Sequence, residues 1–337
     1  MWLLARQLHS LGLDQVVVTT RRSELAQRLG ASGIRVHPAI WSAGLDPRAI
    51  PPILQELRRP ALLHAHDAHA LTLAGLCASL TRSPLIVTRR VTFRLKRAFF
   101  WRRACRIITI SRAVGEALVS DGIDPSRLTL IPSAVDSAPP ALDGVDLRTR
   151  IGLPQRGQVA VSLGALTPEK DHLTLVAAAA RLVRDLPDLH WLIVGDGFLE
   201  KRLRQAIGQL GVEGRVHLLG QWDDPHDALA VADVFVLSSR SEGLGSSVLA
   251  AMAQGVPVVS TRVGGVPELL ESGAGLLVEP GDPVELAAAV HRVLGDPDLR
   301  GSLTRNAHAA LGKYSVNAMA EQVMSVYRSC AHTLDGS

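Results

Sequence analysis

Residues 238–270 read SSRSEGLGSSVLAAMAQGVPVVSTRVGGVPELL, and this stretch defines the fold more clearly than any other. An apolar run ending at Leu237 predicts a strand that leads into a glycine-rich loop, and the loop opens a helix that Gly255 stops. In an open α/β sheet, ligands lie at the carboxyl ends of strands, where a helix N-terminus offers free N–H groups to an anion. The carboxylate of Glu242 in this loop can bind hydroxyls beside that anion. The pattern fits a polyhydroxylated, phosphorylated ligand, and a tight turn with a helix cap is the structural alternative.

On both sides of this stretch, short apolar runs alternate with amphipathic segments. The runs predicted as strands are QVVVTT (15–20), PLIVT (84–88), CRIITI (105–110), QVAVSLG (158–164), LHWLIVG (189–195), RVHLLG (215–220), DVFVLSS (233–239) and VPVVST (256–261). Helices are predicted between strands, for instance over 171–184, 199–210 and 284–294. This alternation indicates parallel sheets covered on both faces. Residues 138–154 carry prolines and glycines without a clean period, so we interpret them as the linker between two doubly wound domains.

The start of the chain departs from this pattern. Residues 1–11 predict an amphipathic helix, whereas a doubly wound domain normally opens with a central strand and a tight turn. We therefore expect a start that omits about 20 residues, a strand plus a turn. A fold that simply begins with a helix is the alternative.

Length and composition limit the class of protein. The 337 residues suggest two domains, and 47% hydrophobic with 20% charged residues excludes a disordered or collagen-like chain. Cys77, Cys105 and Cys330 are widely spaced with no CxxC pair, which argues against a disulfide framework and a structural zinc site and is typical of a reducing compartment. Neither a signal peptide nor a membrane span is recognisable, so we expect a cytoplasmic protein.

The net charge of +4 conceals an asymmetry. Residues 1–145 contain 19 Lys and Arg and 10 Asp and Glu, a net of +9, and residues 146–337 contain 17 and 22, a net of −5. Residues 82–112 contain ten Lys and Arg and no acid, interleaved with aromatic side chains. The interpretation that fits this stretch best is that the segment from Arg82 to Arg112 docks peripherally on an anionic membrane or on an anionic lipid acceptor. This would put the protein at the inner face of the membrane. A solvated basic face is the alternative, and we expect no nucleic-acid partner.

Several motifs together resemble one known family. EGLG (242–245), followed by AMAQGVPVV and GGVPELL, is similar to the nucleotide-sugar site of glycosyltransferase family 4, retaining enzymes of the GT-B fold. Other similar segments are SLGALTPEKDHLTLVAAAA (162–180), IVGDGFLEKRLRQAIGQLG with RVHLLG (193–220), LLHAHDAHA (62–70) and IITISRAVGEAL (107–118). The resemblance covers nearly the whole chain and agrees in the order of the motifs.

The resemblance implies an α/β GT-B fold, in which two Rossmann-like doubly wound domains face a cleft and the first lacks its first strand. It places an acceptor-side domain at 1–140 and a nucleotide-sugar domain at 141–314. The C-terminal helix, 315–337, would cross back to the first domain. The implied activity is the metal-independent transfer of a sugar from a nucleotide-diphosphate donor to a cell-envelope acceptor, a lipid or a polysaccharide such as lipopolysaccharide. No cofactor is implied, because the nucleotide sugar is a substrate.

Site residues carry over position by position. Glu242 matches the glutamate that contacts donor-sugar hydroxyls, and Lys170 matches the lysine that neutralises the leaving diphosphate. His66 follows a predicted strand toward the cleft, and Arg89 or Arg90 would bring charge from the first domain. The predicted donor-binding residues are Gly164, Gly195, Asp196, Gly197, Gly220, Gln221, Gly243, Leu244, Gly245, Ser246 and Ser247. We expect no metal ligands, because neither a carboxylate cluster nor a His/Cys set has metal-ligand spacing.

Three positions depart from the family pattern. Ala250 stands where a second glutamate usually holds the ribose, Ala165 replaces the arginine that usually shares the diphosphate, and Arg89 or Arg90 stands where a first-domain histidine is usual. Each change removes a polar contact worth about 1–3 kcal/mol. A weakened or inactive sugar-nucleotide-binding relative is therefore the alternative function. A nucleotide-sugar epimerase would need more carboxylates in the cleft, and an NAD enzyme is disfavoured because no GxGxxG follows an N-terminal strand.

Overall fold

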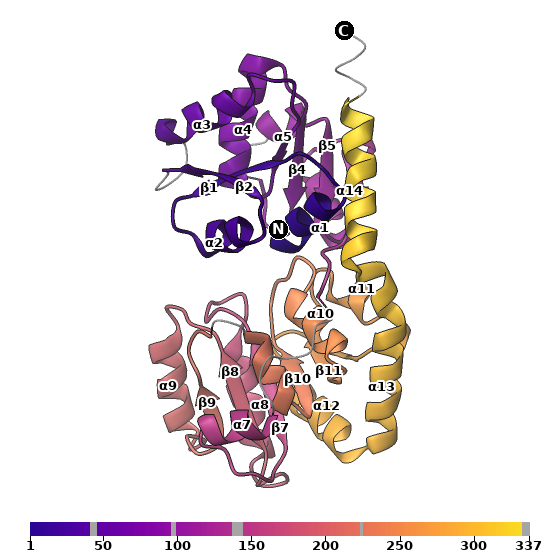
Figure 1. Ribbon diagram of the computed structural model, residues 1–337. Coiled ribbons are helices and arrows are strands. Elements are labelled where there is room, and N and C mark those ends of the chain that lie inside the picture. The colour runs from indigo at the N-terminus through magenta and orange to yellow at the C-terminus, as the bar shows by residue number, and fades with distance from the viewer. Residues whose placement is uncertain (41–45, 96–98, 137–143, 223–224, 332–337) are drawn as a thin grey trace. The chain divides into compact units, whose positions relative to one another are not determined.

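The computed structural model describes residues 1–40, 46–95, 99–136, 144–222 and 225–331. The chain divides into two compact units (Figure 1). Unit 1 comprises Met1–Ala134 with Lys313–Ser337, and unit 2 comprises Val135–Gly312. The sequence analysis put the domain boundaries after residues 140 and 314, whereas the two units divide after residues 134 and 312. Within the described ranges, none of the helices combines the length and the apolar character that a membrane crossing needs.

Unit 2 is built on a parallel sheet of six strands in the order β12-β11-β10-β7-β8-β9. Its strands are β7 (Val159–Leu163), β8 (His190–Val194), β9 (Val216–Leu218), β10 (Val234–Leu237), β11 (Val258–Thr261) and β12 (Leu276–Val278). Every residue of β7, β8, β10 and β11 is buried, as expected for parallel strands covered on both faces. This explains why the sequence shows them as nearly continuous apolar runs.

Helices enclose the sheet of unit 2. They are α7 (Gly144–Arg150), α8 (His172–Leu182), α9 (Glu200–Gln209), α10 (Ser246–Ala253), α11 (Val266–Leu269), α12 (Pro283–Gly295) and α13 (Pro297–Ala310), with short 3-10 turns at Pro225–Val231, Glu271–Gly273 and Leu311–Tyr314. Leu175 and Val290 from α8 and α12 pack with Trp191 and Val236 of the sheet in one core cluster. The residues interpreted as a linker, 138–154, lie partly outside the described residues, and their described part contains α7.

Unit 1 contains two separate parallel sheets. One pairs β1 (Val16–Thr20) with β2 (Arg35–Ala39), and the other joins β3 (Leu63–Ala65), β4 (Leu85–Arg89), β5 (Arg106–Thr109) and β6 (Leu128–Leu130) in that order. The helices are α1 (Trp2–Ser10), α2 (Glu24–Ala31), α3 (Ile50–Glu56), α4 (Ala68–Thr81), α5 (Phe99–Arg103), α6 (Arg112–Ser120) and α14 (Val316–Ala331), with 3-10 turns at Pro47–Ala49 and Pro125–Arg127. Parallel sheets with helices in both units confirm the predicted α/β architecture.

The C-terminal helix α14 belongs to unit 1, although the chain passes through unit 2 before reaching it. Its buried face, including Ala320 and Val323, packs against Leu4 of α1 and against Ile86 and Ile108 of the sheet. Figure 1 shows α14, in yellow, running beside α1 and the strands β4 and β5 of unit 1. The segment is helical because its apolar residues recur at helical spacing along one side.

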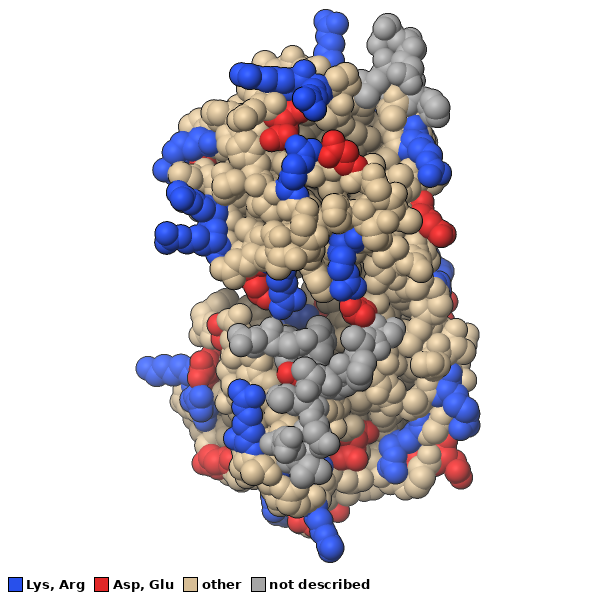
Figure 2. Space-filling view, in the orientation of Figure 1, with Lys and Arg blue, Asp and Glu red and all other residues tan. Residues whose placement is uncertain are grey.

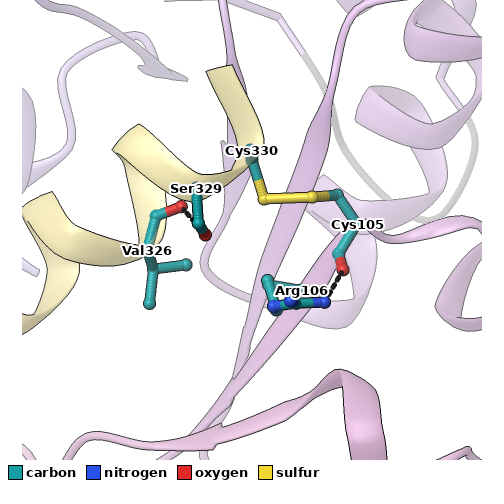
Figure 3. The surroundings of a disulfide bond; sticks show 5 residues. All are labelled: Cys105, Arg106, Val326, Ser329 and Cys330. Atoms are coloured by element: carbon teal, nitrogen blue, oxygen red, sulfur yellow. Dashed lines mark hydrogen bonds between the residues drawn. A yellow bond between two sulfur atoms is a disulfide. The ribbon is translucent and has the colours of Figure 1, made fainter. Parts of the chain in front are cut away.

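A disulfide between Cys105 and Cys330 fastens α14 to the sheet of unit 1 (Figure 3). Cys105 immediately precedes β5 and Cys330 lies in the last turn of α14, 225 positions later in the chain. The sequence analysis argued against a disulfide framework and missed this pair, because spacing along the sequence does not reveal which distant segments pack together. Cys77 is free and buried.

Candidate active site

The topology of unit 2 creates a point where ligands typically bind. The chain runs from β7 to β8 and β9 on one side, then returns to β10 on the other side of β7. At such a switch point the loops after the two central strands diverge and leave a crevice at the carboxyl edge of the sheet. The loops after β7 and β10, residues 164–171 and 238–245, contain the two residues given the main catalytic roles by the sequence analysis.

Lys170 and Glu242 form an ion pair at this point. The Lys170 Nζ lies 2.5 Å from Glu242 Oε1, and the side chains are 23% and 9% exposed. The hydroxyl of Ser239, a fully buried residue, donates to the same carboxylate oxygen at 2.7 Å. A carboxylate so enclosed needs these donors, because burying an unpaired charge is costly. The structure therefore brings together two predicted residues that are 72 positions apart in the sequence.

Hydrogen bonds between the two loops hold this pair in position. Asp171, in the left-handed region with φ 45°, accepts from Arg240 Nε at 2.8 Å and from Thr174 Oγ1 at 2.7 Å. The Ser238 hydroxyl contacts the Lys170 and Asp171 carbonyl oxygens at 3.0 and 3.1 Å. The backbone at Lys170 and Asp171 is thus held by residues of the loop between β10 and Glu242.

Gly264 permits a close approach behind Glu242. A Cβ atom at this position would lie 1.8 Å from the Glu242 carbonyl oxygen, and the φ of 51° is one that L side chains rarely adopt. The segment after β11 can therefore support the loop of Glu242 only with glycine at residue 264. This contact explains why the first residue of the GGVPELL motif is a glycine.

The N-terminus of α10 faces the same switch point. Gly245, with φ 93°, is the cap residue, and Ser246 and Ser247 form the first turn. The first N–H groups of a helix have no partner within the helix, and its dipole favours an anion there. The Ser247 hydroxyl is buried and has no hydrogen-bond partner, which marks an unsatisfied polar group in that turn. This turn can accept a phosphate group.

Other predicted donor-binding residues follow β8 and β9. Gly195 N donates to Gly220 O at 2.8 Å, and Asp196 O accepts from Leu166 N at 2.7 Å. A Cβ on Gly195 would lie 2.1 Å from the carbonyl oxygen of Gly164, so these loops approach backbone to backbone. The remaining predicted residues at the carboxyl edge are Gly197, Gln221, Gly243 and Leu244, of which Leu244 is buried.

The residues predicted from the first domain lie within unit 1 and have partners there. Arg89 is buried, donates to the Val91 and Phe93 carbonyl oxygens and lies 5.2 Å from the Trp101 ring centroid. Arg90 donates to the Ser133 hydroxyl at 3.2 Å. Their roles toward a donor stay predictions.

His66 lies beside two other buried polar side chains of unit 1, His64 and Tyr327. Its ring lies 4.0 Å from that of His64, which contacts the Tyr327 hydroxyl at 2.7 Å. Burial lowers the pKa of His64 to about 3 and lowers that of His66 well below its ordinary value. Both rings are therefore neutral near pH 7, and His66 can act there as a neutral donor or acceptor.

Sequence reasoning missed Ser239, Asp171, Arg240 and His172. The first three support the Lys170–Glu242 pair, as described above. Burial and the neighbouring Lys170 lower the pKa of His172 to about 4, so this ring is neutral beside the site. Sequence reasoning missed these roles because they depend on contacts between loops. The only feature of the sequence that pointed to any of them was the run EKDH, which places Asp171 and His172 directly after Lys170. Across the described ranges, no group of three or more His, Cys, Asp or Glu side chains could hold a metal ion.

Two family models match the chain. The model for "Glycosyl transferases group 1" matches residues 146–310, and that for "Glycosyltransferase Family 4" matches residues 1–138. The matches together cover both units.

Among the many proteins similar to the chain are the following two relatives and one solved structure. A lipopolysaccharide core biosynthesis glycosyltransferase of Rhizobium meliloti (strain 1021) is 36% identical over 54% of this chain and 53% of its own length, so the chain spans about half of that relative. A phosphatidyl-myo-inositol mannosyltransferase of Mycolicibacterium smegmatis is 30% identical over 80% of this chain and 71% of its own length. The crystal structure of HepE from Anabaena in complex with UDP-glucose superposes with a TM-score of 0.85 at 23% identity, covering 97% of this chain and 95% of that one. The last match shows the shared fold.

Proposed function

The chain belongs to glycosyltransferase family 4, the group 1 glycosyl transferases of GT-B fold, and from this membership we propose that it transfers a sugar from a nucleotide-diphosphate donor with retention of configuration. The observation that carries the proposal is the Lys170–Glu242 pair at the switch point of unit 2. A cation for a diphosphate and a carboxylate for sugar hydroxyls are the groups that such a donor requires.

Each member of the pair has a separate role in the proposed reaction. Lys170 and the first-turn amides of α10 stabilise the charge that develops on the leaving diphosphate, which is the largest contribution such a site can make. Glu242 orients the sugar through its hydroxyls. Without donor the two side chains neutralise each other, so neither is a buried unpaired charge. Donor binding replaces their mutual contact with contacts to the diphosphate and the sugar.

A nucleotide-binding protein without turnover is the second candidate, and two positions favour it. Ala250 is buried in α10 and Ala165 is exposed in the loop after β7, so neither supplies a polar group to a ribose or a diphosphate. A donor held by fewer contacts binds more weakly, by about 1–3 kcal/mol for each one lost. Binding without donor cleavage would identify this alternative.

For the acceptor, we propose a cell-envelope lipid or polysaccharide, lipopolysaccharide included, reached at the inner face of the membrane. Two relatives of the chain are a lipopolysaccharide core glycosyltransferase and a phosphatidyl-myo-inositol mannosyltransferase, which supports this class. Figure 2 shows many Lys and Arg side chains on the visible face of unit 1. Within the basic stretch, Phe93 and Phe99 are 53% and 66% exposed, and Arg94 lies between them in sequence. Exposed aromatics beside arginines suit an anionic lipid surface.

The donor proposal can be tested with nucleotides and two variants. UDP, GDP and ADP are compared by thermal stabilisation, and the matching nucleotide sugars are then assayed for cleavage with and without membrane extract. Lys170→Met should abolish stabilisation by the preferred nucleotide, and Glu242→Gln should retain nucleotide binding but lose sugar transfer. Glu279→Gln is the matched control, because that carboxylate pairs with Arg262 on the surface of the same unit. Full transfer by Glu242→Gln would contradict the assignment.

The membrane proposal has its own test. Sedimentation with vesicles of phosphatidylglycerol and phosphatidylcholine should recover the wild-type protein at low salt and lose it as salt rises. Phe93→Ser with Phe99→Ser should reduce recovery several-fold, whereas Phe198→Ser, at a phenylalanine of unit 2 that is 76% exposed, should not. Equal binding to vesicles without anionic lipid would contradict the proposal.

A further inference from the structure

A group of hydrogen-bonded polar side chains connects the C-terminal helix to the sheet of unit 1. Its members are His64 of β3, Thr88 of β4 and Tyr327 of α14. The His64 Nδ1 atom lies 2.7 Å from the Tyr327 hydroxyl, and the Nε2 atom lies 2.7 Å from Thr88 Oγ1. The Tyr327 ring also meets the His64 ring edge-on, with the two centroids 5.6 Å apart. The imidazole of His64 is therefore held at both of its nitrogens.

Burial keeps this group uncharged. It lowers the pKa of His64 to about 3 and raises the pKa of Tyr327 above its ordinary value, so both side chains are neutral near pH 7. A neutral imidazole has one donor nitrogen and one acceptor nitrogen, and a hydroxyl can donate or accept. In either tautomer of His64, each ring nitrogen has a hydroxyl partner. Loss of the Tyr327 hydroxyl would leave Nδ1 as an unpaired polar atom in the interior, which is unfavourable.

The ring of His66 lies against the ring that this group holds. His66 directly follows β3, two positions after His64, so the two side chains share one face of the sheet. Their ring centroids are 4.0 Å apart and the ring planes differ by 34°. At this distance the His66 ring cannot change its rotamer independently of its neighbour. The orientation of His66 therefore depends on that of His64.

The last turns of α14 hold Tyr327 in place. Cys330, three positions later and thus on the same side of the helix, is bonded to Cys105 beside β5. Val326, one position before Tyr327, belongs to the same buried cluster as Ile108 of β5. The Tyr327 hydroxyl thus reaches His64 from a helix that is anchored on the sheet both covalently and by apolar packing.

We infer that Tyr327 is a positioning residue for His66: its hydroxyl orients the His64 ring, and the His64 ring orients that of His66. The inference rests on the proposed function, because it concerns the predicted role of His66 in sugar transfer. A group displaced by about 1 Å from its productive position can lose roughly 100-fold in rate, so a hydroxyl remote from the reacting atoms can affect turnover. If Tyr327 only stabilised the fold, its hydroxyl would affect unfolding and leave the turnover of the folded protein unchanged.

The kinetic test uses Tyr327→Phe, which removes the hydroxyl and keeps the ring. Rates are measured with whichever of UDP-glucose, GDP-glucose and ADP-glucose gives turnover with membrane extract, at a temperature where the variant is folded. We expect kcat to fall about 10-fold and KM to stay within about 2-fold. Tyr314→Phe, at the other of the two tyrosines of the chain, is the matched control and should keep the wild-type kcat. A folded Tyr327→Phe protein with the wild-type kcat would overturn the inference.

A double variant tests whether Tyr327 acts through His64. Tyr327→Phe should cause no further loss of kcat in a His64→Gln protein, because the ring that the hydroxyl orients is then absent. Additive losses of kcat in the double variant would contradict this order of action.

Nuclear magnetic resonance of the histidine rings tests the positioning without any substrate. The nitrogen-15 shifts of the rings, assigned by single substitutions, report the tautomer and the protonation of His64 and His66. In the wild-type protein neither ring should titrate between about pH 5 and 8. Tyr327→Phe should shift the signals of both rings and leave those of His190 and His217, a hydrogen-bonded pair in unit 2, unchanged. Unchanged His66 signals would overturn the inference. Shifted His66 signals in a protein without transferase activity would support the positioning and contradict only the proposed function.

Discussion

Breaking the Lys170–Glu242 pair should cost stability, and a double-mutant cycle can measure the loss. The perturbations are Glu242→Gln, Lys170→Met and the double substitution, each studied without ligand. At 2.5 Å, two unit charges attract by roughly 7 kcal/mol at an effective dielectric of 20. Desolvation offsets much of this attraction. Removing one partner from a fully buried pair typically costs about 3–5 kcal/mol.

The partial exposure of Lys170 lowers this expectation. With 23% of the lysine side chain in contact with solvent, the remaining charge is partly screened, so we expect each single substitution to cost about 2–3 kcal/mol. For a unit of this size the melting temperature falls by about 5–10 °C. The double variant should be more stable than the sum of the single effects predicts, by about 2 kcal/mol, because it leaves no unpaired charge.

The assay is urea unfolding followed by a signal from unit 2. Its core contains Trp191, so fluorescence is suitable once the other four tryptophans are replaced by phenylalanine. The cycle is repeated with saturating nucleotide, which should stabilise the wild-type protein and not Lys170→Met. Additive single effects, with a coupling below about 0.5 kcal/mol, would refute the view that these side chains neutralise each other in the unliganded site.

Three further predictions concern the support of the fold. Gly264→Ala should destabilise unit 2 by about 2–4 kcal/mol and abolish transfer, because the added Cβ would lie 1.8 Å from the Glu242 carbonyl oxygen, whereas Gly214→Ala, with open space around it, should be neutral in the same melts. Reduction of the Cys105–Cys330 disulfide should lower the stability of unit 1 by at most about 5 kcal/mol, from the 225-residue separation, and Cys105→Ser/Cys330→Ser should show no response to reductant in the same urea titration. Folding lowers the pKa of His64 from 6.5 to about 3, so the stability that its neutral ring contributes is complete above pH 6.5 and is lost as the pH falls toward 3. The free energy of unfolding, measured by urea titration at several pH values, should fall by up to about 1.4 kcal/mol per pH unit on this account. A His64→Gln variant with an unchanged slope would contradict this prediction.

The strands that are buried along their whole length were all predicted, and so were β1, β5 and β9, whereas β2, β6 and β12 were not. QVAVSLG and LHWLIVG became β7 and β8, because a parallel strand between two helix layers must be apolar throughout. By contrast, β2 contains Pro38 and is largely unburied, so no apolar run marks it. Its existence depends on pairing with β1, which is a tertiary contact.

The candidate site was predicted in part. Lys170 and Glu242 were assigned to one site by their motifs, and the structure adds that they contact each other directly. The support from Ser239 was not predictable, because a serine after a strand has many roles and only the fold brings its hydroxyl to a carboxylate. The pairing of Cys105 with Cys330 was hidden for the same reason.

The position of α14 in unit 1 has a consequence for biosynthesis. On the ribosome, the 178 residues of Val135–Gly312 must be made after the sheet of unit 1 has emerged and before α14 can cover it. At about 5–20 residues per second, this leaves the apolar surface around Ile86, Ile108 and Ile131 without its cover for roughly 10–40 s. During that interval Cys105 remains a thiol, because its partner Cys330 has not yet been synthesised. The nascent chain is therefore most exposed to aggregation and chaperone capture while unit 2 is being translated.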